Sequence, residues 1–423
     1  MARKMKDSGI EWIGEIPEGW EVIKAKYLFA QRTEKGNSAL VLLSPTQKYG
    51  VIPQSQLEGV VQVKENTDLR VFKTIHIGDF VISLRSFQGG FEFSNYEGVC
   101  SPAYQVFHAT KDLSNDFFRY LFKSDGFISK INGLTVGIRE GKNIQYWDFS
   151  NMLLALPPKE VQIRSAQYLN AKCTEIDTML SKTRSSIEEY KKLKQAVITQ
   201  AVTKGVRGER EMKDSGVAWI GEIPAEWSKC HLKNISSEIG DGLHGTPNFD
   251  DNGDVFFING NNLGGEYVEP RADTKRINSE EFLKYTRPFF SNQTIMISLN
   301  GSYGKVSLYK NFPMLLGKSA GYITLLPSID CRYIKYYLSS TPSQIMMTLS
   351  LNGTTIPNLS LNTLRNFSIF LPVLCEQKEI ADYLDAKCAE IDGLIAKKEQ
   401  LVKELESYKK SLIYEVVTGK RGV

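Results

Sequence analysis

The sequence MKDSGIEWIGEIPEGW at residues 5–20 returns as MKDSGVAWIGEIPAEW at residues 212–227, an offset of 207 positions. A second pair of repeats lies further along. YLNAKCTEID begins at Tyr168 and YLDAKCAEID begins at Tyr383, an offset of 215 positions. The stretches between these repeats are much less alike. Shared ends around divergent middles predict one scaffold that carries two different domains.

The second pair of repeats lies in segments with helical periodicity. Between Lys159 and Thr203, apolar residues return at alternating three- and four-residue steps with mixed charges between them, which is typical of a coiled-coil seam. Pro158 precedes this segment and Gly205 follows it, as expected for helix boundaries. Residues 375–418 repeat the pattern. We therefore expect two long helices that pair as an antiparallel coiled coil, since internal two-fold symmetry reverses one helix against the other.

The divergent middles, roughly residues 20–155 and 228–370, have the pattern of mixed α/β domains. Short β-branched and aromatic runs alternate with clusters of Gly, Asn and Pro. At the 215 offset, ISLR at residues 82–85 falls on ISLN at 297–300, and GKNI at 141–144 falls on IPNL at 356–359. The expected fold class is α+β: two related mixed α/β domains joined by two long helices, with internal pseudo-two-fold symmetry.

The two ends of the chain complete the repeat. The stretch TKGVRGEREMKDSG that begins at Thr203 is continuous, whereas its counterpart is split between TGKRGV at the end of the chain and ARKMKDSG at its start. Joining the ends would regenerate the central segment. We therefore expect the two termini to lie close together.

Composition places few limits on function. The chain has 423 residues, 42% hydrophobic and 24% charged, with a formal net charge of +4, which is ordinary for a soluble protein of two to four domains. It lacks an apolar run of the ~18 residues that a membrane span needs and an apolar secretory signal. Six cysteines without a CxxC pair argue against zinc and disulfides and favour a reducing, cytoplasmic setting. The mild basic charge permits nucleic-acid binding without requiring it.

Motifs of catalytic and nucleotide sites are missing. The chain lacks GxGxxG, HExxH and the [ND]PP[YF] tetrapeptide of amino-methyltransferases. GIREGKN at residues 137–143 and NGSYGKVS at 300–307 lack the GxxxxGK[ST] spacing that lets backbone amides surround a phosphate. We therefore expect no catalytic residue and no metal site.

Polar, Gly-rich loops lie at corresponding positions of the two middles. Their Arg, Gln, Asn, Ser and Thr side chains match the donors and acceptors of base edges, and their Lys and Arg also suit phosphates. Each loop alone is better explained as a turn, but different residues at matching positions of the two repeats favour readers of different targets. The candidate DNA-binding residues are Arg85, Ser86, Gln88, Arg139, Lys142 and Asn143 in the first domain, and His244, Thr246, Asn248, Asn259, Asn261, Asn300, Tyr303, Lys305, Asn352, Thr354 and Thr355 in the second.

The repeated SGxxWIGEIPxxW element has two explanations. Its Trp, Ile and Pro side chains either pack each domain onto the scaffold or form a docking surface that a partner uses twice. The candidate partner-binding residues are Trp12, Ile13, Trp20, Trp219, Ile220 and Trp227. Cys173 and Cys388 occupy equivalent seam positions and are expected to be core residues.

In combination, these motifs resemble the specificity (S) subunits of type I restriction–modification systems. The likeness covers essentially the whole chain. It rests on the MKDSGxxWIGEIPxxW openings, on LSPTQKYGVIP and SLRSFQGGFEFS in the first middle, on the YLxAKCxEID helices, on IGDGLHGTPNF in the second middle, and on the closing TGKRG.

The resemblance implies a division of the chain. Residues 1–155 would be a first target-recognition domain with its opening repeat, 156–208 the central spacer helix, 209–370 a second target-recognition domain, and 371–423 the C-terminal spacer helix. Each domain would read one half of a bipartite site in double-stranded DNA. The helices would set the gap between the halves and dock the methyltransferase subunits.

The resemblance also implies that the chain is not itself an enzyme and binds no cofactor. Two M (methyltransferase) subunits would use S-adenosylmethionine to methylate adenine N6, and R (restriction) subunits would use ATP and Mg²⁺ to translocate and cleave DNA. Two alternatives remain: a two-fold protein-binding adaptor without DNA specificity, and an enzyme with its own nuclease or methylase centre. The missing motifs weigh against the enzyme, whereas an adaptor should expose an apolar hot spot.

Overall fold

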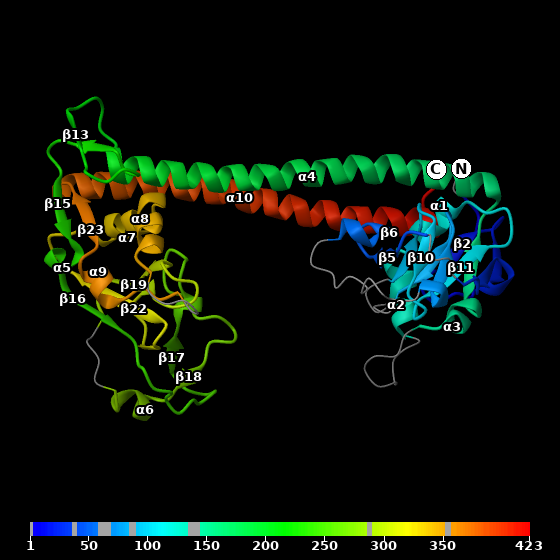
Figure 1. The fold of residues 1–423 in the computed structure, drawn as a ribbon, viewed down its shortest axis with the longest axis horizontal. Helices are drawn as coiled ribbons and strands as arrows, with labels where there is room; N and C mark the ends of the chain where they lie inside the picture. The colour runs from blue at the N-terminus through cyan, green and yellow to red at the C-terminus, as the bar shows by residue number, and fades with distance from the viewer. Residues whose placement is uncertain are drawn as a thin grey trace. The chain divides into compact units, whose positions relative to one another are not determined.

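The computed structural model describes residues 3–35, 40–57, 69–83, 90–133, 144–285, 290–351 and 357–423. It divides into two compact units: unit 1 comprises residues 1–184 and 400–423, and unit 2 comprises residues 185–399. Both units draw on two long helices, α4 (Lys159–Lys204) and α10 (Leu374–Val417). Unit 1 takes the first part of α4 and the last part of α10, and unit 2 takes the remainder (Figure 1).

The predicted helices agree with α4 and α10 to within one residue at each end. The residues that stop them explain why. Gly205 and Gly419 follow the helices at φ values of 77° and 75°, a left-handed conformation that only glycine adopts without strain. Pro157 and Pro158 precede α4, and Pro372 precedes α10, so prolines set where both helices begin.

Within each unit the two helix segments pack antiparallel, as predicted. In unit 1, Lys409 Nζ lies 2.6 Å from Asp177. In unit 2, Lys194 Nζ lies 2.6 Å from Asp392, and Arg207 Nε lies 2.9 Å from Glu379. In unit 1 Arg184 also pairs with Glu406, so residue numbers on α10 fall as those on α4 rise; in unit 2 Arg207, just beyond the end of α4, continues the same order.

The seam residues of both helices are buried. Cys173 and Cys388 are each 5% exposed, and burial raises the pKa of both thiols. These two cysteines are therefore core residues, as expected from their seam positions.

Unit 1 is built on an antiparallel sheet of order β4-β11-β8-β9, formed by Phe29–Arg32, Gln105–Ala109, Phe80–Ile82 and Phe91–Phe93. Two-stranded pairs surround it: β1 (Met5–Asp7) with β2 (Glu15–Pro17), β3 (Glu21–Lys24) with β12 (Leu153–Leu156), β5 (Leu43–Thr46) with β6 (Gly50–Pro53), and β7 (Lys73–Ile75) with β10 (Gly98–Cys100). The short helices are α1 (Asn115–Leu121), α2 (Asp125–Gly133) and α3 (Tyr146–Ser150), with 3₁₀ turns η1 (Ala25–Tyr27), η2 (Gln54–Gln56) and η3 (Leu69–Val71).

Unit 2 repeats this layout around the antiparallel sheet β16-β22-β19-β20, formed by Ser236–Asp241, Ala320–Leu325, Thr294–Ser298 and Val306–Leu308. The pair β13 (Met212–Asp214) and β14 (Glu222–Pro224) corresponds to β1 and β2, and β15 (Ser228–His231) with β23 (Ser368–Leu371) corresponds to β3 and β12. Its helices are α5 (Leu232–Ile235), α6 (Ser279–Leu283), α7 (Cys331–Ser339), α8 (Thr341–Leu349) and α9 (Leu361–Arg365), with the 3₁₀ turn η5 (Gly260–Asn262). A further sheet, β18-β17-β21, comprises Arg276–Ile277, Val255–Ile258 and Met314–Leu316.

The two units fill the same layout with different side chains. Unit 1 has a phenylalanine core, in which the Phe107 and Phe149 ring centroids lie 4.8 Å apart and the Phe80 and Phe107 centroids 5.3 Å apart. Unit 2 has a core of aliphatic and tyrosine residues, among them Ile295, Ile323 and Tyr333. Equivalent elements with different core residues explain why the two middles look unrelated in sequence although both are mixed α/β.

Both termini belong to unit 1 and lie close together, as predicted (Figure 1). Gly422 lies beside the guanidinium group of Arg3, and Gly419 packs against Pro17 and Trp20. Among the described residues, no helix combines the length and apolar character that crossing a membrane requires.

Leu384→Ala tests the role of the seam. Leu384 is fully buried in the core of unit 2, so truncation should destabilise the protein by about 2–5 kcal/mol and lower the urea midpoint of unfolding. Lys194→Ala is the control, because it removes only the ion pair with Asp392 on the helix surface, worth less than about 1 kcal/mol. If both variants lost the same free energy of unfolding, the stability of the protein would not depend on the apolar seam.

Candidate nucleic-acid interface

Four chain segments of unit 2 meet at one end of its main sheet. Strands β16 and β19 both run antiparallel to β22, so the ends of β16 and β19 lie beside the start of β22. The Leu299 N–H donates to the Ser319 carbonyl at 2.9 Å, and the Leu359 N–H donates to the Leu299 carbonyl at 2.9 Å. Backbone hydrogen bonds therefore hold these loops in fixed positions next to one another.

These segments enclose a cavity of about 440 Å³, the sheet-end cavity. Its polar lining comes from different loops, and His244 and Asn300 are two residues that the sequence predicted. His244 Nε2 lies 2.6 Å from Asp241 Oδ2, and Asn300 Nδ2 donates to the Lys318 carbonyl at 3.4 Å. The polar side chains lining the cavity are Asp241, His244, Asn300, Lys318, Asn358 and Ser360.

The other described candidates lie elsewhere in unit 2. Thr246 is exposed in a loop, and Asn261 is exposed in the 3₁₀ turn η5. Asn259 Oδ1 accepts a hydrogen bond from Ser319 Oγ at 3.1 Å, which ties two loops together. The hydroxyl groups of Tyr303 and Thr348 lie 3.2 Å apart, and the half-buried Lys305 side chain runs along Gly264.

Asn248 has a structural role that the sequence did not reveal. Its N–H donates to Glu281 Oε1 at 3.0 Å, and its Nδ2 donates to Glu281 Oε2 at 3.4 Å. The Glu281 side chain is only 5% exposed and also accepts from Lys284 Nζ at 2.7 Å. The Lys284 hydrogen bond, followed by that from the Asn248 backbone, lowers the pKa of Glu281 to about 2. A buried carboxylate therefore anchors the loop that carries His244.

The remaining candidates lie outside the described residues. These are Arg85, Ser86, Gln88, Arg139, Lys142 and Asn143 in the first domain and Asn352, Thr354 and Thr355 in the second. Residues that the sequence reasoning missed lie in the sheet-end cavity, namely Asp241, Lys318 and Asn358. The alignment of GKNI with IPNL contained a signal for Asn358, because 358 − 215 = 143 places it on Asn143.

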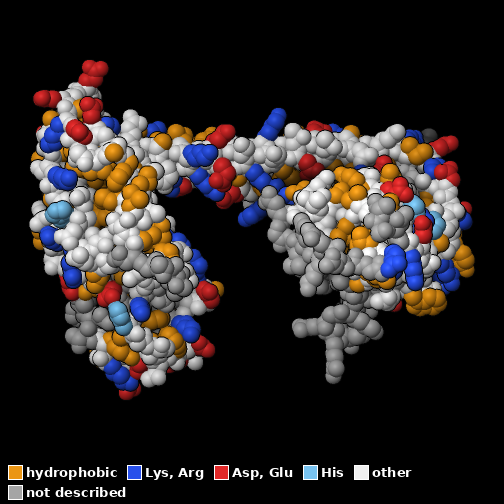
Figure 2. All heavy atoms as spheres, viewed as in Figure 1, with side chains coloured by type: hydrophobic (Ala, Val, Ile, Leu, Met, Phe, Trp, Pro, Cys, Tyr) orange, Lys and Arg blue, Asp and Glu red, His pale blue; other side chains and the backbone are white. Residues whose placement is uncertain are grey.

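The charge on the visible surface is mixed. Figure 2 shows Lys and Arg side chains interspersed with Asp and Glu on the viewed face of both units. This agrees with the net charge of +4. Recognition by unit 2 would therefore depend on specific polar groups more than on a broad basic field.

Three candidate partner-binding residues are core residues, so their prediction as docking residues is wrong. Ile13, Trp20 and Trp227 are 1%, 3% and 1% exposed, respectively. The Trp20 ring packs edge-on against Phe117, and the Trp227 ring packs edge-on against Tyr333, each at a centroid distance of 6.5 Å. These side chains are inaccessible to a partner because they hold the repeat on its domain.

Trp12 and Trp219 are equivalent in sequence but differ in environment. Trp12 is half-buried against Phe127 at a centroid distance of 6.1 Å, and Tyr414 Oη donates to its carbonyl at 3.1 Å. Trp219 is 42% exposed. The position in unit 2 that corresponds to Tyr414 is Thr199 (414 − 215), which is too small to reach this site.

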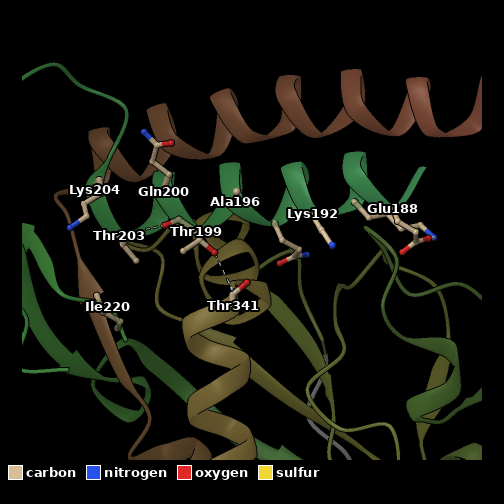
Figure 3. A pocket seen from close by; sticks show the side chains of 11 residues that line it. Glu188, Lys192, Ala196, Thr199, Gln200, Thr203, Lys204, Ile220 and Thr341 are labelled. Atoms are coloured by element: carbon tan, nitrogen blue, oxygen red, sulfur yellow. Dashed lines mark hydrogen bonds and ion pairs between the residues drawn. The ribbon is translucent and has the colours of Figure 1, made fainter. Parts of the chain in front are cut away.

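Where Thr199 takes the place of Tyr414, unit 2 has a groove of about 740 Å³, which we call the Ile220 groove. Figure 3 shows α4 side chains lining one wall, with Thr341 opposite them; the Thr341 N–H donates to Thr199 Oγ1 at 3.4 Å. At the corresponding place in unit 1, Lys410 pairs with Asp125 at 3.7 Å beside Tyr414. Beside the repeated element, Tyr414 therefore fills the space in unit 1, whereas the equivalent space in unit 2 is the Ile220 groove.

In the part of the chain that the structure describes, no group of three or more His, Cys, Asp or Glu side chains is placed to hold a metal ion.

Glu281→Ala should release the loop that carries His244. At pH 7 the Asn248 amide should exchange hydrogen at least about tenfold faster than in the unaltered protein, because a buried acceptor has been lost. Glu280→Ala, an exposed neighbour, should leave exchange unchanged.

The pH dependence of protection at Asn248 follows from the lowered pKa of Glu281. A carboxyl group with a depressed pKa stabilises the fold fully above its ordinary pKa of 4.5, and the contribution is lost as pH falls toward about 2. The protection factor at Asn248 should therefore be the same at pH 7 and pH 5. Loss of protection between these two values would contradict the assignment.

Comparison with known proteins places this geometry in a family. Residues 224–404 match the family model described as the type I restriction modification DNA specificity domain. The chain is 25% identical over 422 residues to the type I restriction enzyme MjaVIII specificity subunit of Methanocaldococcus jannaschii, covering 96% of this chain and 93% of that protein.

Two solved structures share the fold. A chain from a study of complex assembly and conformational transition of the type I R-M system superposes with a TM-score of 0.72 at 17% identity, covering 96% of this chain and 99% of that chain. The HsdS subunit from Thermoanaerobacter tengcongensis gives a TM-score of 0.55 at 16% identity, covering 96% and 98%. Together with the repeated motifs, these matches show that residues 224–404 form a type I restriction modification DNA specificity domain and that nearly the whole chain is similar to specificity subunits of type I restriction–modification systems.

Proposed function

We propose that this chain selects the DNA site of a type I restriction–modification complex, with each α/β domain reading one half of a bipartite site. The observation that carries the proposal is a scaffold repeated twice around domains of the same layout whose exposed polar residues differ. In unit 2 these residues gather in the sheet-end cavity. Two domains of one layout with different polar residues suit a DNA site whose two halves differ in sequence.

The chemistry of the sheet-end cavity suits a base edge. Asn300 and Asn358 each present an amide, whose adjacent donor and acceptor match adenine N6 and N7. The Lys318 ammonium group donates only, which suits guanine O6 and N7 or a phosphate. Different backbone segments supply these groups and hydrogen bonds hold those segments together, so the groups are positioned before DNA arrives.

The reaction belongs to the partners in this proposal. Two M subunits supply S-adenosylmethionine and methylate adenine N6, and R subunits supply ATP and Mg²⁺ for translocation and cleavage. The specificity chain binds none of these cofactors and contributes recognition, spacing and docking. Helices α4 and α10 set the gap between the two halves of the site.

A second candidate function is a protein-binding adaptor without DNA specificity. Two observations favour it: the open Ile220 groove, and the exposed Trp219, the residue before Ile220 in the chain, because exposed tryptophans are frequent hot spots for protein partners. The groove also serves the first proposal, in which an M subunit docks there. The two functions differ in whether the chain determines a DNA sequence.

Mapping of modified bases tests the proposal directly. DNA from cells that co-express this chain with its M subunit should contain N6-methyladenine in both halves of one split motif, with a fixed gap. Cells that express the M subunit alone are the control and should lack the motif. A split motif that depends on this chain supports the reader function, whereas modification without sequence preference by an active M subunit supports the adaptor.

Trp219→Ala should weaken association with the M subunit. Truncating a tryptophan hot spot costs at least about 2 kcal/mol, or about 30-fold in Kd, which calorimetric titration of the purified subunits would measure. Trp147→Ala is the matched control, because Trp147 is 71% exposed in unit 1 and lies outside the repeated element. Equal Kd values for Trp219→Ala and the unaltered chain would exclude Trp219 as a docking residue.

A further inference from the structure

We infer that three glutamines, Gln31, Gln105 and Gln145, determine the specificity of unit 1, and that Lys318 and Asn358 do so in unit 2. This inference rests on the proposed DNA-reading function and names the residues that perform it. Both sets lie at the same end of the corresponding sheet.

The sheet geometry of unit 1 brings the glutamines together. Strands β4 and β8 both run antiparallel to β11, so the ends of β4 and β8 lie beside the start of β11. Gln31 is the penultimate residue of β4, Gln105 is the first residue of β11, and Gln145 is the N-cap of α3. Strand β8 ends at Ile82, shortly before the candidate loop that includes Arg85.

The three side chains form a row of amides. Gln31 Nε2 donates to Gln105 Oε1 at 2.6 Å, and Gln105 Nε2 lies 3.5 Å from Gln145 Oε1. Gln31 and Gln145 are exposed and Gln105 is half-buried. Because Gln31 pairs with Phe107 in the β-register, Gln31 and Gln105 are diagonal neighbours on one face of the sheet.

Apart from the position of Gln145 at the N-cap of α3, folding alone does not require this row. Exposed amide–amide hydrogen bonds contribute little to stability, because water offers equivalent partners in the unfolded chain. A row of uncharged amides instead offers paired donors and acceptors, the chemistry that reads adenine N6 and N7 in the major groove. The fixed spacing of the row lowers the entropy that binding must overcome.

The corresponding end of unit 2 carries different groups on the same framework. At the 215 offset, Gln145 falls on Ser360 (145 + 215), which is the N-cap of α9 and lines the sheet-end cavity. Gln105 falls on Ala320 (105 + 215), the first residue of β22. The amide row is therefore absent from these positions of unit 2.

Lys318 and Asn358 supply the polar groups there instead. Both are exposed, and Asn358 forms an isolated β-bridge with Asn300, which fixes its backbone at the cavity wall. Asp241 holds the His244 ring at the opposite side through the 2.6 Å hydrogen bond. A donor-only ammonium group beside amides predicts that unit 2 reads a guanine as well as an adenine, whereas the neutral row of unit 1 predicts A·T-containing contacts.

The test uses the complex of this chain with its M subunit. Gln105→Ala, Lys318→Ala and Asn358→Ala would each be purified with the M subunit, and methylation of a library of DNA sites would be measured by mapping N6-methyladenine. Gln105→Ala should relax base preference in one half of the motif only. Lys318→Ala and Asn358→Ala should relax it in the other half only, each by about 5- to 150-fold, the discrimination that one base contact supplies.

Matched controls and a salt series distinguish base reading from general effects of substitution and from phosphate contacts. Gln167→Ala and Asn292→Ala replace exposed amides, Gln167 on α4 and Asn292 just before the start of β19, which is the end of the sheet opposite the sheet-end cavity, and should leave the motif unchanged. If Lys318→Ala weakened binding equally for all sequences and reduced the salt slope by about 1, Lys318 would be a phosphate contact and its assignment as a reader would be overturned.

Failure of this inference differs from failure of the proposed function. If the unaltered complex methylates a split motif and the Gln105 and Asn358 variants retain it at every position, the residue assignment is wrong while the reader function stands. If the unaltered complex is active but shows no sequence preference, both fail.

Discussion

The buried seam between α4 and α10 is the constraint on which the rest of the structure depends. Its residues are shared with the domain cores rather than forming a separate layer. Leu169, Ile176 and Leu412 belong to the same apolar cluster as the phenylalanines of unit 1. Ile198, Ile380 and Leu384 belong to the same cluster as Ile295 and Tyr333 of unit 2. Each α/β domain therefore cannot form its core without its part of both helices.

This sharing has a functional consequence. Because helix and domain have one core, the loops at the sheet end are attached to the helix pair without a flexible joint inside each unit. A reader that is rigid on its own support loses little entropy when it meets DNA. The repeated Trp-Ile-Pro element adds to this attachment, since Trp20 and Trp227 pack into the domains rather than facing a partner.

The seam and the long helices could be predicted because they depend on local sequence. A three- and four-residue periodicity, flanking prolines and a following glycine determine the bounds of α4 and α10. The half-burial of Trp12 and the exposure of Trp219 could not be predicted in this way, because both lie in nearly identical sequence. The difference between Trp12 and Trp219 arises from α10 in one unit and α4 in the other: Tyr414, 402 positions from Trp12, contacts it, and Thr199 stands at the equivalent place in unit 2.

The candidate site was predicted only in part for the same reason. Gly- and Asn-rich loops were the predicted sites, and His244 and Asn300 from two of these loops line one cavity. Gln31, Gln105 and Lys318 have no motif around them, and their proximity to the other polar groups comes from strand order and direction. Asn248 had the expected residue type but serves Glu281, a buried partner that no local pattern indicates.

The central claim is that the two domains read DNA independently on one scaffold. Exchange of residues 20–155 for those of a related specificity chain, followed by mapping of N6-methyladenine in cells that also express the M subunit, tests it most directly. Independent readers predict that one half of the split motif changes while the other half and the gap remain. A change in both halves, or an unchanged motif, would contradict it.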